Sequence, residues 1–394
     1  MNVSMAVVGN LPPLLFLTFH NVYGLSYAEL GFLVLLNFST QLIVDLIFSF
    51  FPHKFNISAT VKLTPLITVL GFLIFTLWPT FFAGSAFLGL IVGTVIFSSS
   101  AGLSEVLLNP VIAALPSDNP ERELSRLHST YAWGAVGVVT FATVFILIFG
   151  ASMWQWLVML LLIVPVSTFL LYSGAELPHI EVGESSDSSA SVLKNSCMWL
   201  SVIAIFLGGA IECTMAQWAS SFSEVALGIP KIFGDIFGVA LFALMLGTGR
   251  TLYARYGRNI ERVMIAGAVV SAVCYLVAVF SDNAVIGLIA CALTGFSASM
   301  LWPGNIIAAT ERVGGGVVMY ALMAAGGDLG ASLGPELVGI VTDAVAANPD
   351  MLSLATDLGM TAEQLGMKCG LLVGALFALV AIPFYICIFR RKKT

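Results

Sequence analysis

Long apolar runs alternate with short polar segments along the whole chain. About 20 apolar residues let a helix cross the hydrocarbon core of a bilayer, and Gly scattered inside such runs favours packed helices over barrel strands. We therefore expect twelve transmembrane helices. Their expected ranges are 3–22, 26–51, 60–80, 84–115, 127–149, 152–173, 197–222, 231–254, 260–281, 283–306, 316–345 and 367–389.

The composition excludes a water-soluble domain, because 59% of the 394 residues are hydrophobic and only 10% are charged. Of the 16 Lys and Arg residues, all but Lys231 and Lys368 fall on one side of the expected helices. Basic loops are retained in the cytoplasm. We therefore expect a multi-pass protein of the plasma membrane, such as a bacterial inner membrane, with both termini in the cytoplasm.

The longest polar segment, 173–195, is rich in Ser and lies between the sixth and seventh expected helices. Such a composition indicates a flexible linker. We expect an N-terminal six-helix bundle over 1–173, a cytoplasmic linker over 174–196, and a C-terminal six-helix bundle over 197–394 with a basic tail. The expected fold is an all-α membrane protein with two pseudo-symmetric bundles around a central cavity. The other long loop, 346–366, can form a short surface helix.

Five acidic residues lie inside the expected spans and away from the span ends, namely Asp45, Glu105, Glu212, Asp328 and Glu336. A charged carboxylate at membrane depth costs at least about 2.5 kcal/mol, so each of these residues is a candidate for function. The third, sixth, ninth and twelfth expected helices carry no such charge. We expect those four helices to lie at the periphery, facing lipid, and the others to line the cavity.

Polar residues recur at helical spacing on three of the charged spans, which places them on one face of each helix. The three predicted polar stripes are Asn37, Gln41 and Asp45 on 26–51, Ser98, Glu105 and Asn109 on 84–115, and Asp328, Ser332 and Glu336 on 316–345. In the seventh expected helix Glu212 and Gln217 are five residues apart, about 140° around the helix. These two residues can share a site only if that helix is broken.

The segment AGLSEVLLNPVIAAL, residues 101–115, resembles the fourth-helix signature GLxExxxNP of the fucose/proton symporter family within the major facilitator superfamily. Glu105, Asn109 and Pro110 fall on its key positions. The resemblance implies that Glu105 couples proton movement to sugar uptake. Where that family has an acid in its first helix, this chain has Pro13. A second coupling carboxylate, if one is needed, would come from Asp45 or Asp328.

The segment GRTLYARYGRN, which follows the eighth expected helix, resembles the cytoplasmic-loop signature of the same superfamily. The resemblance implies a gating role for Arg250, Arg255 and Arg258. Recognition of a sugar needs hydrogen-bonding groups and aromatic faces on helices that reach the cavity. The expected substrate-binding residues are Asn10, Asn109, His128, Tyr131, Trp133, Glu212, Gln217, Trp218, Trp302 and Asn305.

The sequence contains no GxxxxGK[ST] or HExxH motif, so we expect no enzyme activity and no cofactor or metal beyond a coupling proton or Na⁺. We expect a monomer in the lipid bilayer that binds no nucleic acid. The expected function is proton-coupled symport of a sugar or related small polar solute by alternating access. The alternatives are proton-antiport efflux of amphipathic compounds, sodium-coupled sugar uptake through hard oxygen ligands, and a non-transporting receptor of the same fold.

Overall fold

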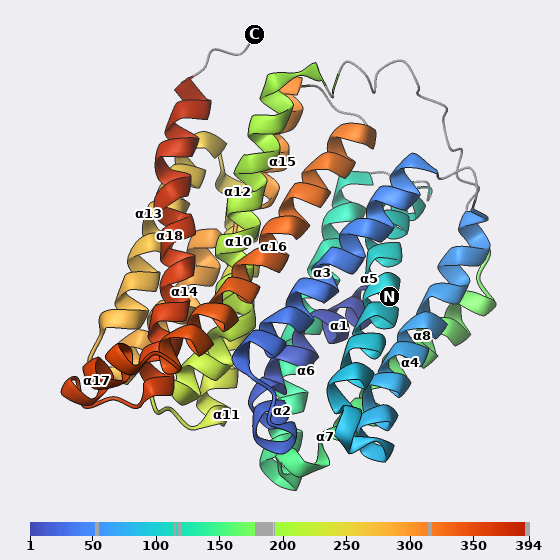
Figure 1. Ribbon diagram of the computed structural model, residues 1–394. Helices are drawn as coiled ribbons and strands as arrows, with labels where there is room; N and C mark the ends of the chain where they lie inside the picture. The colour runs from blue at the N-terminus through green and yellow to red at the C-terminus, as the bar shows by residue number, and fades with distance from the viewer. Residues whose placement is uncertain are drawn as a thin grey trace. The chain divides into compact units, whose positions relative to one another are not determined.

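The computed structural model describes residues 1–51, 55–113, 116, 120–177, 192, 194–313 and 317–390. The regular structure in these ranges is helical (Figure 1). The helices before residue 178 are α1 (Asn2–Leu14), α2 (Phe16–Tyr23), α3 (Tyr27–Phe50), α4 (Ile57–Phe81), η2 (Ala83–Ser85), α5 (Ala86–Ala113), α6 (Pro120–Phe149), η3 (Ala151–Met153), α7 (Trp154–Leu161) and α8 (Ile163–Ser173). The later ones are α10 (Ser196–Val225), α11 (Lys231–Phe233), η4 (Gly234–Ala240), α12 (Leu241–Tyr256), α13 (Ile260–Phe280), α14 (Ala284–Ala298), α15 (Pro303–Val313), α16 (Val317–Ala346), α17 (Pro349–Asp357) and α18 (Ala362–Arg390).

The expected membrane character is confirmed. Within the described residues, 10 helical stretches are long and apolar enough to cross a membrane, and the bent pair α1 and α2 makes an eleventh. The remaining expected span, 127–149, falls in α6, where the apolar part Trp133–Phe149 is shorter. That α6 makes a twelfth crossing therefore stays a prediction. The surface helix expected in the loop 346–366 is present as α17, whose N-terminus is capped by the Asn348 side chain.

Two details of helix continuity bear on the expected sites. Helices α1 and α2 meet at an angle of 47°, directly after Pro12 and Pro13. Proline lacks a backbone N–H and its ring clashes with the preceding turn, which explains the bend. By contrast, α10 runs unbroken for 30 residues. The break that would let Glu212 and Gln217 share one site is therefore absent from this described helix.

The chain forms two compact units. The first contains Met1–Tyr23 and Leu36–Ser186, and the second contains Gly24–Leu35 and Asp187–Thr394. The units divide inside the segment 174–196 that was expected to be the linker. The sequence did not indicate that the first turns of α3 belong to the second unit, while the rest of α3 belongs to the first.

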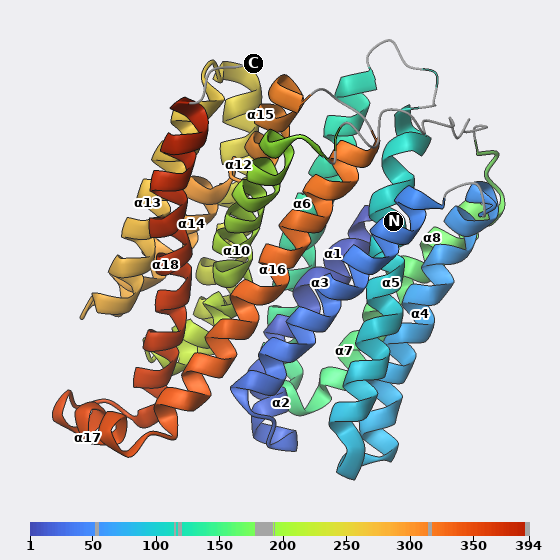
Figure 2. The ribbon, with the colours of Figure 1, turned by 45° about the horizontal axis from the view of Figure 1, so that its top comes forward.

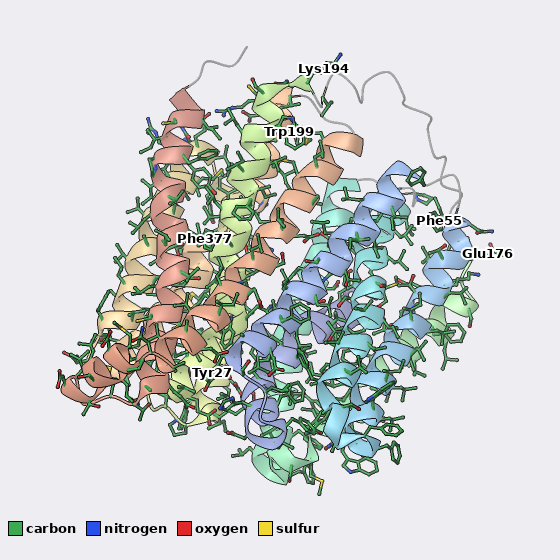
Figure 3. The ribbon with its side chains drawn as sticks, viewed as in Figure 1. Tyr27, Phe55, Glu176, Lys194, Trp199 and Phe377 are labelled. Carbon is green, nitrogen blue, oxygen red and sulfur yellow. The ribbon has the colours of Figure 1, made fainter. Side chains whose placement is uncertain are left out.

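Hydrogen bonds at the start of α3 explain this assignment. Ser26 and Glu29 form a capping box, in which the Ser26 N–H donates to Glu29 Oε2 at 2.8 Å and the Glu29 N–H donates to Ser26 Oγ at 3.2 Å. The Asp343 carboxylate of α16 accepts two further N–H groups, from Tyr27 at 3.2 Å and Ala28 at 2.6 Å. These N–H groups have no partner within their own helix. Tyr27 is labelled at this helix start in Figure 3.

In the first unit, α4 packs along α5 and α8, and α1 packs along α6 (Figures 1 and 2). Its core contains the rings of Phe72, Phe75 and Phe97, with Phe72 stacked on Phe97 at 4.6 Å between centroids. Gly71 lets α4 approach α5, because a Cβ there would come within 2.5 Å of the Phe97 nitrogen. Small residues permit such close packing where lipid supplies no hydrophobic driving force between helices.

In the second unit, α10 packs on α16 and α18, and α13 packs on α14 and α18. Figure 2 shows α17 continuing from the end of α16. Three glycines at four-residue spacing, Gly326, Gly330 and Gly334, lie against α10. A Cβ on any of them would press on the α10 backbone, so the sequence of α16 allows these two helices to pack at backbone distance.

Candidate functional site

The first unit contains a hydrogen-bonded polar stripe between α3 and α5. The Ser98 hydroxyl donates to Asn37 Oδ1 at 2.6 Å, and the Gln41 amide donates to the same oxygen at 3.0 Å. All three side chains are buried. The two stripes predicted separately on 26–51 and 84–115 are therefore joined through Asn37.

Glu105 extends this stripe along α5. The residues Ser98, Gly102 and Glu105 lie within about 60° of one another around the helix axis. Gly102 is the point of close approach, since a Cβ there would lie 3.0 Å from the Gln41 carbonyl oxygen. Glu105 is half-buried, and Asp45 on α3 is 2% exposed. The first unit thus holds two carboxyl residues on helices that pack through polar and glycine contacts.

Other expected binding residues of this unit make local contacts. The Asn10 amide donates to the Ala6 carbonyl of its own helix at 2.9 Å. The Tyr131 hydroxyl lies beside Gly9 of α1, where a Cβ would come within 2.9 Å of it. Trp133 on α6 is 68% exposed. The side chains of two further candidates lie outside the described part of the chain, namely Asn109 and His128.

In the second unit, Glu212 of α10 is ion-paired with Arg250 of α12. Arg250 Nη2 lies 3.1 Å from Glu212 Oε1 and 3.2 Å from Oε2, and Arg250 Nε donates to the Ser299 carbonyl at 3.1 Å. A residue expected to bind substrate is thus paired with one expected to gate. Arg250 lies inside α12 and not on the cytoplasmic loop that the signature implies. Its side chain links α12 to Glu212 of α10 and to the Ser299 carbonyl. Arg255 and Arg258 are exposed near the end of α12.

Two tryptophans expected at the cavity pack against neighbouring helices of the second unit. Trp218 is fully buried, and its indole N–H donates to the Pro335 carbonyl of α16 at 2.9 Å. Trp302 lies over Gly209 of α10 and Gly327 of α16, where an added Cβ would come within 3.1 Å and 2.5 Å of its ring. Trp218 has no exposed surface and packs between α10 and α16 in this structure.

Asn305 also bonds to groups of neighbouring helices. Its amide nitrogen lies 3.1 Å from the Ala204 carbonyl of α10, 2.6 Å from the Leu301 carbonyl and 3.1 Å from the Tyr385 hydroxyl of α18. The Tyr385 hydroxyl in turn donates to the Ala204 carbonyl at 3.1 Å. These bonds connect α15 to α10 and α18. Two further expected residues, Gln217 and Asp328, are buried on α10 and α16.

A polar cluster at the start of η4 was missed from the sequence. Asp235 is 1% exposed and accepts a hydrogen bond from the Ser220 hydroxyl of α10. Lys231 Nζ lies 3.2 Å from Asp235 Oδ1 and 3.1 Å from Ser220 Oγ. The four-residue spacing of Lys231 and Asp235 was the available signal. Nowhere in the described residues do three His, Cys, Asp or Glu side chains form a possible metal site.

Solved transporter structures share this fold. A bacterial homolog of the human lysosomal transporter Spinster, inward-facing and occupied, matches with a TM-score of 0.76 and 13% identity, covering 99% of this chain and 95% of that one. The E. coli fucose:proton symporter FucP matches with a TM-score of 0.63 and 17% identity, covering 98% and 96%. The nucleoside transporter NupG matches with a TM-score of 0.71 and 14% identity, covering 99% and 97%. Identities this low demonstrate a shared fold alone.

No curated protein matches the sequence. The family model of the Major Facilitator Superfamily matches residues 1–335, which is most of the chain. This match agrees with the membrane spans, with the helical architecture and with the resemblance of residues 101–115. The chain therefore belongs to the Major Facilitator Superfamily, and it is a multi-pass membrane transporter of a small-molecule substrate.

Proposed function

We propose that the protein is a proton-coupled symporter of a sugar or related small polar solute, with Glu105 as the coupling carboxyl group. The position of Glu105 carries the proposal. It is a half-buried acid in an apolar helix, on the same face as Ser98 of the polar stripe. A carboxyl group binds its proton more tightly in dry surroundings than in water. Alternating access would change those surroundings and so let the group take up and release a proton.

The chemistry of the stripe supports a polar solute. Asn37, Gln41 and Ser98 bring amide and hydroxyl groups together inside an apolar unit. Such groups fit the hydroxyls of a sugar, because a few placed polar groups orient a ligand in a pocket. Two structural neighbours are described as a fucose:proton symporter and a nucleoside transporter. Both of those substrates carry ring hydroxyl groups, which supports the class without identifying the solute.

Replacement of one carboxyl group tests the coupling role. In proteoliposomes with an imposed pH difference, Glu105→Gln is expected to abolish concentrative uptake while energy-independent counterflow continues, because the amide binds no transported proton. The matched control is Glu176→Gln, an exposed acid after α8 that is labelled in Figure 3. The control is expected to behave as the unaltered protein. Concentrative uptake by Glu105→Gln would refute the assignment.

A ligand screen tests the substrate class. A solute that binds the native state raises the melting temperature, and at 100 times its dissociation constant it adds about 2.7 kcal/mol of stability. We expect shifts with monosaccharides or nucleosides and none with amphipathic dyes. Shifts with dyes alone would favour the efflux alternative. Uptake that follows an imposed Na⁺ gradient instead of a pH difference would favour sodium coupling.

A further inference from the structure

The first unit contains a second buried acid, Asp45 on α3, to which the proposed function gives no role. Its side chain is 2% exposed. The packing of α3 on α5 indicates where Asp45 lies relative to Glu105.

The two helices run parallel and in register. Asn37 bonds to Ser98, a separation of 61 residues. One turn further, Gln41 lies against Gly102, and 102 minus 41 is again 61. Equal offsets at successive turns mean that both helices advance together at about 1.5 Å per residue. The next turn of α3 brings Asp45 to the level of residue 106, beside Glu105.

The helices also approach closely at this level. A Cβ at Gly102 would lie 3.0 Å from the Gln41 carbonyl oxygen and 3.1 Å from Val44 Cβ. Glu105 lies less than one turn beyond this contact and on the same side of α5 as Ser98. Asp45 lies one turn beyond Gln41 on the buried stripe of α3. Both carboxyl groups therefore follow the point of closest approach in the same direction.

We infer that Asp45 and Glu105 form a single coupling site in which the two carboxyl groups share one proton. The inference rests on the proposed function of Glu105. Two adjacent carboxylates repel each other when both are charged, and such a pair titrates as a unit. The proton comes from water on one side of the membrane and is released to water on the other, so no further reactant is required.

Among the described residues of the first unit, α4 contributes Lys62, the segment after α8 contributes Glu176, and α1 contributes no charged residue. The start of α6 contributes charged or titratable side chains that lie outside the described residues: Glu121, Arg122, Glu123, Arg126 and His128. A contact between Asp45 and a base of this segment is the competing role for Asp45. In that role Asp45 would support the conformational change and not proton coupling.

Transport by three variants separates these roles. Asp45→Asn, Glu105→Gln and the double variant are compared for the ratio of protons to substrate and for counterflow. The inference predicts that each single variant loses proton movement but keeps counterflow. The double variant should show the same loss of proton movement as either single variant, because both substitutions remove the same proton-sharing pair. Loss of coupling in Glu105→Gln alone would overturn the pair and leave the proposed function intact. Coupled transport by both single variants would overturn both proposals.

Cross-linking tests the geometry independently of transport. All native cysteines lie at residue 197 or later, so the first unit is free of them. Asp45→Cys combined with Glu105→Cys is expected to react with a short thiol cross-linker. Ile43→Cys with Glu105→Cys is the control, since Ile43 is 55% exposed and lies on another face of α3. This test also applies if Asp45→Asn loses counterflow and the transport assay cannot separate the roles. A higher cross-linking yield for the Asp45/Glu105 pair than for the Ile43/Glu105 pair supports the inference, and equal yields for the two cysteine pairs overturn it.

Discussion

Replacement of Gly330 by Ala should destabilise the second unit, because α16 packs there on the backbone of α10. A Cβ at Gly330 would overlap the Phe206 carbonyl oxygen and lie 2.8 Å from its carbon and 2.9 Å from the Ala210 nitrogen. Ordinary contacts begin at 3.4 Å. Both neighbours are main-chain atoms that no change of rotamer can move, so the two helices must separate by at least about half an ångström.

The expected cost follows from two opposing terms. Overpacking of a well-packed interior costs about 1–3 kcal/mol, and a backbone clash lies at the upper end of this range. Alanine returns up to about 1 kcal/mol through its higher helix propensity. The net loss is about 2 kcal/mol, and a unit of about 200 residues loses about 2–4 °C of melting temperature per kcal/mol. We therefore expect the melting temperature to fall by about 4–8 °C.

The assay is thermal unfolding of the purified protein in detergent, followed by tryptophan fluorescence. Gly137→Ala is the matched control, because it is the same substitution inside helix α6 at a position with no neighbouring atom within 4 Å of the new Cβ. The control should melt at or slightly above the temperature of the unaltered protein. Equal melting temperatures for the two variants would refute the backbone-contact argument.

Two further substitutions test polar contacts of the second unit. Glu212→Gln should lower the free energy of unfolding by about 1–2 kcal/mol, a modest loss because the Arg250 side chain is 40% exposed. Adding Arg250→Met should recover part of this loss, because it removes the unpaired charge. A double variant that melts at a lower temperature than Glu212→Gln would contradict this prediction. Asp343→Ala should lower the free energy of unfolding by about 1–2 kcal/mol, because the N–H groups of Tyr27 and Ala28 lose their acceptor. Hydrogen exchange in residues 24–35 should become faster. Unchanged exchange there would show that these bonds do not hold the start of α3.

Local features of the fold were predictable from the sequence. The spans follow from apolar length, and the bend between α1 and α2 follows from Pro12 and Pro13, since both depend only on neighbours along the chain. The polar stripe of α3 was predictable from its four-residue spacing. Its partner was not, because the hydrogen bond from Ser98 to Asn37 joins residues 61 apart.

Residue roles were harder to predict than positions. Trp218 and Asn305 were expected to bind substrate, and the structure shows that each donates a hydrogen bond to a backbone carbonyl of a neighbouring helix in the second unit. A sequence shows that a residue is polar and lies in a span, but not which backbone carbonyl faces it. Asp235 was missed for the same reason, because its burial depends on Ser220 of another helix.

The sequence by itself determined that this chain crosses a membrane repeatedly and carries costly carboxyl groups, because transfer to lipid acts on each segment separately. Only the tertiary structure decided which of these groups have partners. It pairs Glu212 with Arg250, places Asp343 where it accepts hydrogen bonds from the start of α3, and brings α3 into register with α5 at Gly102. These contacts depend on helix packing between distant segments, which no local pattern specifies.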